Sequence, residues 1–101
     1  MTKQQLNDRY WTTVKNTAKS FNLGIGQDCA VHLRGFVQAG ISRLERDGFL
    51  NNTQKINEAE EHLIAFVGGM AYEAKSKGFV ELREVTFFAA KQRFCPLWPF
   101  C

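Results

Sequence analysis

Apolar residues recur at steps of three and four along almost the whole chain, which is the spacing that places them on one face of a helix. The pattern predicts four helices, over residues about 3–22, 28–47, 53–77 and 81–94. Glycine-bearing turns separate these segments, and no stretch alternates apolar and polar residues for long enough to indicate a strand. The sequence therefore predicts an all-α fold, a compact four-helix domain formed by residues 1–101.

The residues at the expected helix starts support these boundaries. Thr2 and Gln5 have the spacing of a capping box, in which the hydroxyl group caps the first turn and the glutamine side chain reaches back. Asp28 is expected to cap the second helix, and Asn52 or Thr53 the third. Such short polar side chains accept hydrogen bonds from the free amides of a first turn.

Glycines mark the expected ends of the first three helices. Residues 22–26 include Gly24 and Gly26 and are expected to close the first helix, since glycine readily takes the left-handed conformation. Gly48 and Gly78 are each followed by phenylalanine and a second apolar residue. This repeated tripeptide predicts one turn geometry at both places rather than an internal repeat.

The size and composition of the chain indicate a single soluble domain. With 101 residues, 45% of them hydrophobic and 23% charged, the chain can build one modest core. Its longest mostly apolar run, 63–72, is about half the length of a membrane span, and its first residues contain no apolar segment typical of a signal peptide. We therefore expect a cytoplasmic protein with no membrane partner.

The last eight residues combine three aromatic residues, two prolines and two cysteines. Pro96 and Pro99 stop the fourth helix, because proline lacks an amide hydrogen and clashes with the preceding turn. A solvated tail normally has a polar composition. Residues 95–101 are therefore expected to form a non-helical tail that packs on the helices, on a partner or around a metal.

The fourth helix has apolar residues on two faces, and the second face needs a cover. In one interpretation Leu97, Trp98 and Phe100 fold back over Phe87 and Phe94. In the other, these five residues form an aromatic patch that binds a protein partner. The patch predicts a small non-enzymatic protein-binding, adaptor or inhibitor module.

The third helix has small residues opposite its expected core face. Ala65, Gly68 and Gly69 lie there together with the larger Tyr72, and glycine in a helix interior costs about 1 kcal/mol relative to alanine. Three explanations are open: self-association as a homodimer across a two-fold axis, a central helix packed on both sides, or a kink at the two glycines.

Cysteine and histidine side chains indicate a possible zinc site. Cys29 and His32 share one face of the second helix, and Cys95 and Cys101 flank the proline turn. Together they would supply a tetrahedral set of three sulfurs and one imidazole. No cofactor is expected otherwise. In a reducing cytosol free thiols or metal ligands are favoured over a Cys95–Cys101 disulfide, which remains the alternative.

Basic side chains on the second and fourth helices suggest a nucleic-acid-associated protein as another alternative. They are Arg34, Arg43, Arg46, Lys91 and Arg93. The formal net charge is only +3 and acidic residues are interleaved, so a solvated surface is the favoured explanation.

No group of residues in the sequence has the arrangement of an active site. Glu58, Glu60, Glu61 and His62 do not converge on one side of the third helix, and they are expected to form a charged surface. The chain has no nucleophile with an orienting partner and no cofactor loop. We therefore expect no catalytic residues and no enzymatic activity.

Overall fold

The computed structural model describes residues 1–82, 87–95 and 97–101. It contains α1 (Lys3–Ser20), α2 (Gln27–Arg46), α3 (Thr53–Ser76) and α4 (Phe87–Phe94). The predicted all-α architecture is confirmed, and the first three helices end within two residues of the predicted positions.

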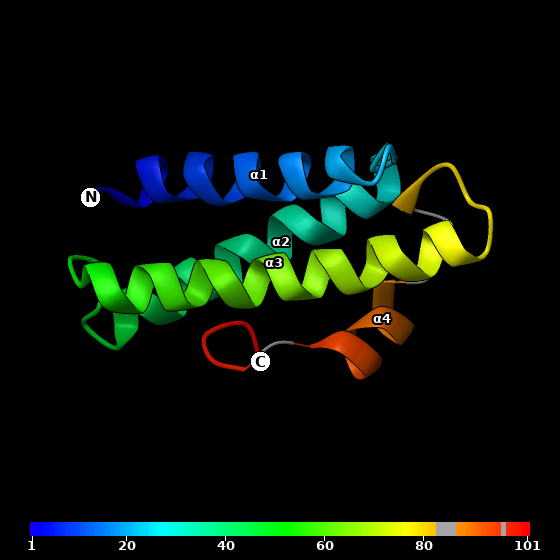
Figure 1. Ribbon diagram of the computed structural model, residues 1–101. Coiled ribbons are helices and arrows are strands. Elements are labelled where there is room, and N and C mark those ends of the chain that lie inside the picture. Colours follow the sequence, from blue (N-terminus) through cyan, green and yellow to red (C-terminus); the bar gives the residue numbers. More distant parts are fainter. Residues whose placement is uncertain (83–86, 96) are drawn as a thin grey trace.

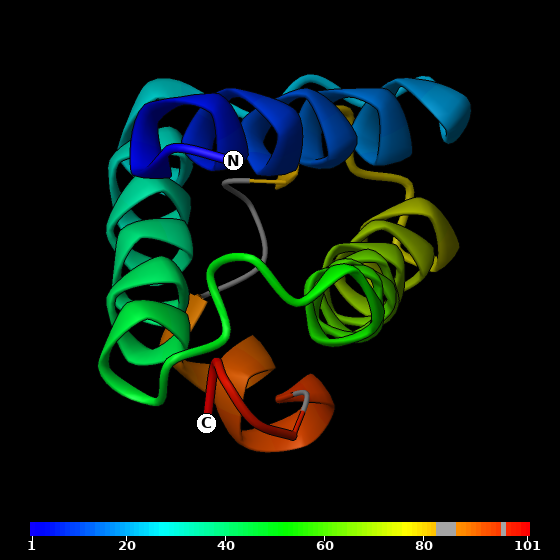
Figure 2. The same cartoon turned by 90° about the vertical axis from the view of Figure 1, so that its left-hand side faces the viewer.

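The helices enclose the core from four sides. Viewed end-on in Figure 2, α1 lies across the top, α2 and α3 form two sides, and α4 with the last residues closes the fourth. The predicted apolar stripes of α1, α2 and α3 all face inward and are fully or almost fully buried. The side chains at the centre include Leu6, Tyr10, Val14, Leu33, Val37, Leu44, Leu63, Phe66 and Met70. Burial of these stripes is what holds the four segments together.

The predicted caps of α1 and α3 are confirmed. The Thr2 hydroxyl group accepts a hydrogen bond from the amide of Gln5 at 3.1 Å, and the Gln5 side chain accepts one from the amide of Thr2 at 3.0 Å. Asn52 caps α3 by accepting a hydrogen bond from the amide of Lys55 at 3.0 Å. Both helices therefore begin where local sequence signals placed them.

The junction between α1 and α2 differs from the prediction. Asn22, rather than Gly24, takes the left-handed conformation with φ 57°, which asparagine tolerates better than most residues. The N-cap of α2 is Gly26, with φ 83° and no side-chain cap. Asp28 lies two residues after the cap position, in the first helical turn, where its negative charge suits the helix dipole.

The two Gly-Phe turns share one geometry, as the sequence predicts. Gly48 and Gly78 have φ values of 81° and 75°. In each turn the amide of the following phenylalanine reaches back to a helical carbonyl, Phe49 to Leu44 at 2.8 Å and Phe79 to Ala74 at 2.9 Å. Both aromatic rings pack against the core, so each turn ends a helix and adds a ring to the interior.

The predicted start of the fourth helix at residue 81 is wrong. Glu81 forms an isolated parallel bridge with Gly24. The amide of Gly24 donates to the carbonyl of Val80 at 3.1 Å, and the amide of Leu82 donates to the carbonyl of Gly24 at 2.8 Å. This pairing holds the backbone extended where the sequence predicted a helix. Residues 83–86 of the predicted helix lie outside the described residues.

A buried carboxylate joins the end of α3 to α4. Lys77 and Arg93 donate hydrogen bonds to Oε1 of Glu73 at 3.0 and 2.7 Å. The hydrogen bonds from Lys77 and then Arg93 lower the pKa of Glu73 below its ordinary 4.5, although burial opposes the shift. Because the folded pKa is below the unfolded one, the stabilisation is complete above about pH 4.5 and is lost as the pH falls through the folded value.

We therefore expect acid to destabilise the wild-type protein more than a Glu73→Gln variant. Urea midpoints measured from about pH 6 down to about pH 3 should fall more steeply for the wild type. Glu45→Gln, which removes an exposed pair with Lys3, is the control and should follow the wild-type curve. Parallel curves for the wild type and Glu73→Gln would contradict the prediction.

Candidate interaction surface

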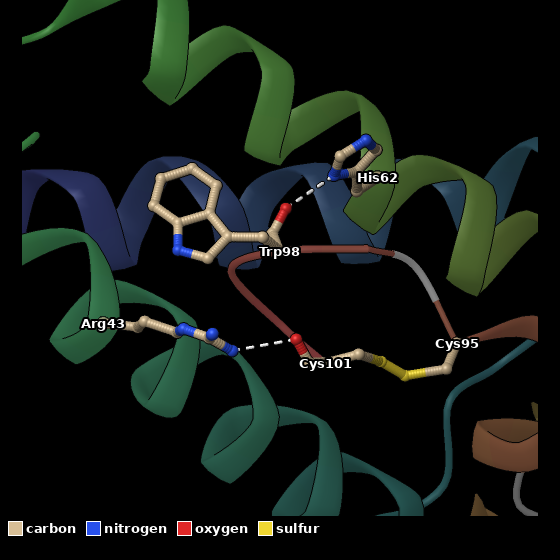
Figure 3. The surroundings of a disulfide bond; sticks show 5 residues. All are labelled: Arg43, His62, Cys95, Trp98 and Cys101. Carbon is tan, nitrogen blue, oxygen red and sulfur yellow. Dashed lines mark hydrogen bonds between the residues drawn. A yellow bond between two sulfur atoms is a disulfide. The ribbon is translucent and has the colours of Figure 1, made fainter. Parts of the chain in front are cut away.

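After α4 the chain folds into a closed loop, called here the disulfide loop (residues 95–101). Cys95 and Cys101 are joined by a disulfide bond, with their Cα atoms 6.4 Å apart (Figure 3). The favoured prediction of free thiols or metal ligands is therefore wrong, and the alternative is correct. The chain turns back on itself between the two cysteines, with the amide of Phe100 donating to the carbonyl of Leu97, and this reversal brings the sulfur atoms together.

Three side chains from α2, α3 and the turn after α2 hold the disulfide loop in place. Arg43 donates a hydrogen bond to the main-chain oxygen of Cys101 at 2.8 Å, and His62 contacts the main-chain oxygen of Trp98 at 2.8 Å (Figure 3). Because that oxygen can only accept, Nδ1 of His62 carries the hydrogen. The Trp98 indole donates to Asp47 at 2.8 Å. The loop therefore bridges α2 and α3.

Phe100 is the residue that inserts the disulfide loop into the core. Its side chain is only 7% exposed. The ring stacks on Phe36 with centroids 5.0 Å apart and lies 6.2 Å from the ring of Tyr10. It also lies directly over Gly40, where a methyl group would overlap it. Phe100 is thus a core residue rather than part of an exposed patch.

Phe87 and Phe94 of α4 are also half-buried against their own chain. Phe87 lies between α2 and α3, with its ring centroid 5.9 Å from those of Phe36 and Phe66. Phe94 rests on Gly69 of α3, with a ring atom 2.8 Å from the position that a Cβ atom would occupy. Because α2 and α3 supply these contacts, the second apolar face of α4 is covered without a partner.

Leu97 is the residue of the predicted patch that faces solvent most fully. Its side chain is 75% exposed. Trp98 beside it is half-buried, with its ring 5.5 Å from that of Phe49 and 5.6 Å from the ammonium group of Lys55. A continuous aromatic patch, as predicted, is therefore not formed. Of the five residues Leu97 is exposed, Trp98, Phe87 and Phe94 are half-buried, and Phe100 is buried.

The four predicted zinc ligands do not form a metal site. Cys95 and Cys101 are bonded to each other. Cys29 is buried, and burial raises the pKa of its thiol to about 11. His32 is exposed and stacks on Phe87 with centroids 5.4 Å apart. Among the described residues no group of three or more His, Cys, Asp or Glu side chains could hold a metal ion.

The predicted self-association residues on α3 divide into two groups. Gly69 accommodates Phe94 of its own chain, so its small size serves the packing of α4. Gly68 faces open space, and Ala65 and Tyr72 are exposed. α3 continues as one helix through both glycines. Contact between two copies through this face remains a prediction.

Four of the five basic residues weighed for nucleic-acid binding contact groups in their own chain. Arg34 lies over the ring of Trp11 at 4.2 Å, and Arg46 pairs with Asp47 at 3.5 Å. Arg43 and Arg93 make the contacts described above, while Lys91 is exposed. Nucleic-acid binding remains a prediction.

The residues that anchor the disulfide loop carry no signal of that role in the sequence. Arg43, Asp47 and His62 have no pattern that sets them apart from other charged surface residues. Gly40 did carry a signal, because it is a glycine on the apolar face of a helix. Such a residue indicates that another group approaches the helix closely, and that group is Phe100.

The fold and the loop define a small all-α domain with a disulfide-closed loop on one side. No protein-family model, curated protein or solved structure matches this chain. In the part of the chain that the structure describes, every helix is too short or too polar to cross a membrane.

Proposed function

We propose that this chain is a non-enzymatic protein-binding module that presents the disulfide loop to its partner. The observation that carries the proposal is the exposure of Leu97 in a loop that contacts within the chain hold at Cys95, Trp98, Phe100 and Cys101. Cys95 and Cys101 are covalently joined, Trp98 is held by hydrogen bonds, and Phe100 is buried. The leucine is therefore displayed by a rigid support.

Rigidity favours binding because a loop that is already ordered loses little conformational entropy when a partner docks. Burying a leucine side chain contributes about 1.5–3 kcal/mol, and Leu97 leaves most of that free energy unused in the isolated domain. Trp98 lies next to it, and tryptophan is enriched among residues that dominate protein interfaces. The partner that fits this surface is a protein with a shallow apolar pocket.

The side chains that could have acted as a nucleophile, an acid or a base support the proposal of a non-enzymatic role. Cys29 is buried with a raised pKa, the opposite of a reactive thiolate. Glu60 accepts hydrogen bonds from Arg9 and Thr13 of α1. His62 holds the disulfide loop. Each of these side chains therefore has a structural role.

The location of the protein is also a proposal. The composition of the chain predicts a cytoplasmic protein, but a disulfide persists in oxidising compartments. We therefore propose that the functional form works where Cys95 and Cys101 remain oxidised. Trapping of thiols in cells followed by mass spectrometry should find these two cysteines unmodified by the thiol reagent. Alkylation of both cysteines would contradict this proposal and would favour the cytoplasm, as the sequence predicts.

Replacing Leu97 by serine tests the binding surface. We expect Leu97→Ser to weaken partner binding about 30-fold, the effect of losing a dominant interface residue, without changing the unfolding curve. Affinity is measured by surface plasmon resonance against the protein that cross-links to the wild-type loop. Val31→Ser on α2 removes a side chain of similar exposure, 66%, and should bind normally. Equal affinities for the wild type and Leu97→Ser would refute the proposal.

A further inference from the structure

The outer face of α3 is an apolar helix surface that the rest of the described chain leaves uncovered. In Figure 1 α3 lies in front of α2, between α1 and α4, and in Figure 2 its outer side is open. Ile64 is 43% and Tyr72 is 71% exposed. With about 100° per residue, six residues share an arc of about 100° on this face. We call them the α3 stripe: Glu61, Ile64, Ala65, Gly68, Tyr72 and Lys75.

Gly68 at the middle of the α3 stripe makes room for no other described part of its own chain. A Cβ atom added there would meet no atom of the described residues within 4 Å, whereas one added at the neighbouring Gly69 would meet Phe94. Glycine is among the least favourable residues in a helix interior. A glycine with open space in front of it lets another helix approach the backbone closely, and no helix of this chain occupies that space in the described residues.

The α3 stripe is complementary to itself when reversed. Ile64 lies four residues before Gly68 and Tyr72 four residues after it. Glu61 lies seven residues before Gly68 and Lys75 seven residues after it. An antiparallel helix crossing at Gly68 would therefore place Tyr72 on Ile64 and Lys75 against Glu61 of the second copy. A two-fold axis repeats each contact.

The charges at the two ends of the α3 stripe are available for such pairs. Glu61 and Lys75 are both exposed, and neither forms an ion pair with another described residue. In the antiparallel arrangement opposite charges meet at both ends, whereas a parallel arrangement would place Glu61 against Glu61 and Lys75 against Lys75. Charge complementarity therefore selects both the occupant and its direction.

The outer face of α2 provides a comparison. It also carries an exposed apolar side chain, Val31, and a glycine with open space, Gly35. Seven residues before Gly35 is Asp28 and seven residues after it is Ser42, so the ends of this face do not complement each other. Self-complementarity distinguishes α3 from a face that merely contains small and apolar residues.

From the uncovered apolar side chains and the reversed charge pattern we infer that the α3 stripe is a self-association surface, and that its occupant is a second copy of this chain packed antiparallel across Gly68. The inference goes beyond the proposed function. The stripe contains no residue of the disulfide loop, so the dimer would carry two loops, and either proposal can fail without the other.

Charge exchange tests the direction and the partner together. Sedimentation equilibrium of the full chain at low salt should show a monomer–dimer equilibrium with a dissociation constant of about 10–100 μM, since one helix face is smaller than a standard interface. Glu61→Lys and Lys75→Glu should each weaken the dimer about tenfold, because two attractions become two repulsions. The double variant should return within about threefold of wild type.

A bulky residue at the crossing point gives an independent measurement. Gly68→Leu should abolish the dimer, whereas Gly35→Leu on α2 should leave the dissociation constant unchanged, with circular dichroism showing native helix content for both. A wild-type chain that stays monomeric to about 1 mM, a charge-exchanged double variant as weak as the single ones, or equal effects of the two leucines would each overturn the inference.

Discussion

Replacing Phe100 by alanine is expected to lower the free energy of unfolding by about 3 kcal/mol. The expected loss is large because the ring is almost completely buried, stacks on Phe36 and packs at a tilt against Tyr10. Its removal leaves a cavity between α1 and α2 that the rigid helices cannot fill, and it detaches the disulfide loop from the core. Urea unfolding followed by circular dichroism measures the change.

Leu97→Ala in the same loop is the control for Phe100→Ala. Because Leu97 is mostly exposed, its truncation should change the free energy of unfolding by no more than about 0.5 kcal/mol. Equal effects of the two substitutions would show that Phe100 is not inserted into the core.

A second substitution at the same contact separates packing from helix propensity. Alanine is favoured over glycine in a helix by about 1 kcal/mol, yet a methyl group at Gly40 would overlap the Phe100 ring. Gly40→Ala should therefore destabilise the wild-type protein but stabilise the Phe100→Ala variant. Gly35→Ala, which meets open space, should stabilise both. Substitutions at two residues in contact do not have additive effects on stability. An identical effect of Gly40→Ala in the wild-type protein and in Phe100→Ala would therefore contradict the contact.

Removing the disulfide is expected to lower the free energy of unfolding by about 2 kcal/mol. The bond closes a short loop, and without it the unfolded chain gains conformational entropy. We expect this loss in a variant with both Cys95→Ser and Cys101→Ser, and in the wild-type protein after reduction with a dithiol. Urea midpoints with and without reductant measure it.

Counting thiols checks the covalent structure on which this prediction depends. The chain has three cysteines, and Cys29 is the free one. Unfolded protein without reductant should therefore react with one equivalent of a thiol reagent, and with three after reduction. The double serine variant should show one equivalent and no effect of reductant on stability. Three reactive thiols in the untreated protein would contradict the disulfide.

Local patterns account for the parts of the fold that the sequence predicts correctly. The stripe that contains Leu33, Val37 and Leu44 predicts which face of α2 is buried, because helical geometry places these residues together whatever they contact. Thr2 and Asn52 predict helix starts because a cap needs only the amides of the next turn. Gly48 and Gly78 predict helix ends because glycine readily takes the left-handed conformation, which is also a local property of the chain.

Contacts between distant residues account for the parts that the sequence predicts incorrectly. The pairing of Glu81 with Gly24 shortens the fourth helix, and no signal near residue 81 indicates it. The aromatic side chains at 87, 94 and 100 were expected on a common surface because the chain holds more rings than one helix face needs. In the structure they pack on α2 and α3 instead: the rings of Phe87 and Phe100 both contact Phe36, and Phe94 rests on Gly69.

The sequence by itself therefore determined the all-α class, the first three helices and their inward faces, since each depends on interactions within a few residues. Only the tertiary structure decided where the chain after α4 runs. Arg43 reaches an oxygen 58 residues away and His62 one 36 residues away, and Gly40 makes room for a ring from the other end of the chain. Such contacts depend on how the helices are placed in space, which no local pattern specifies.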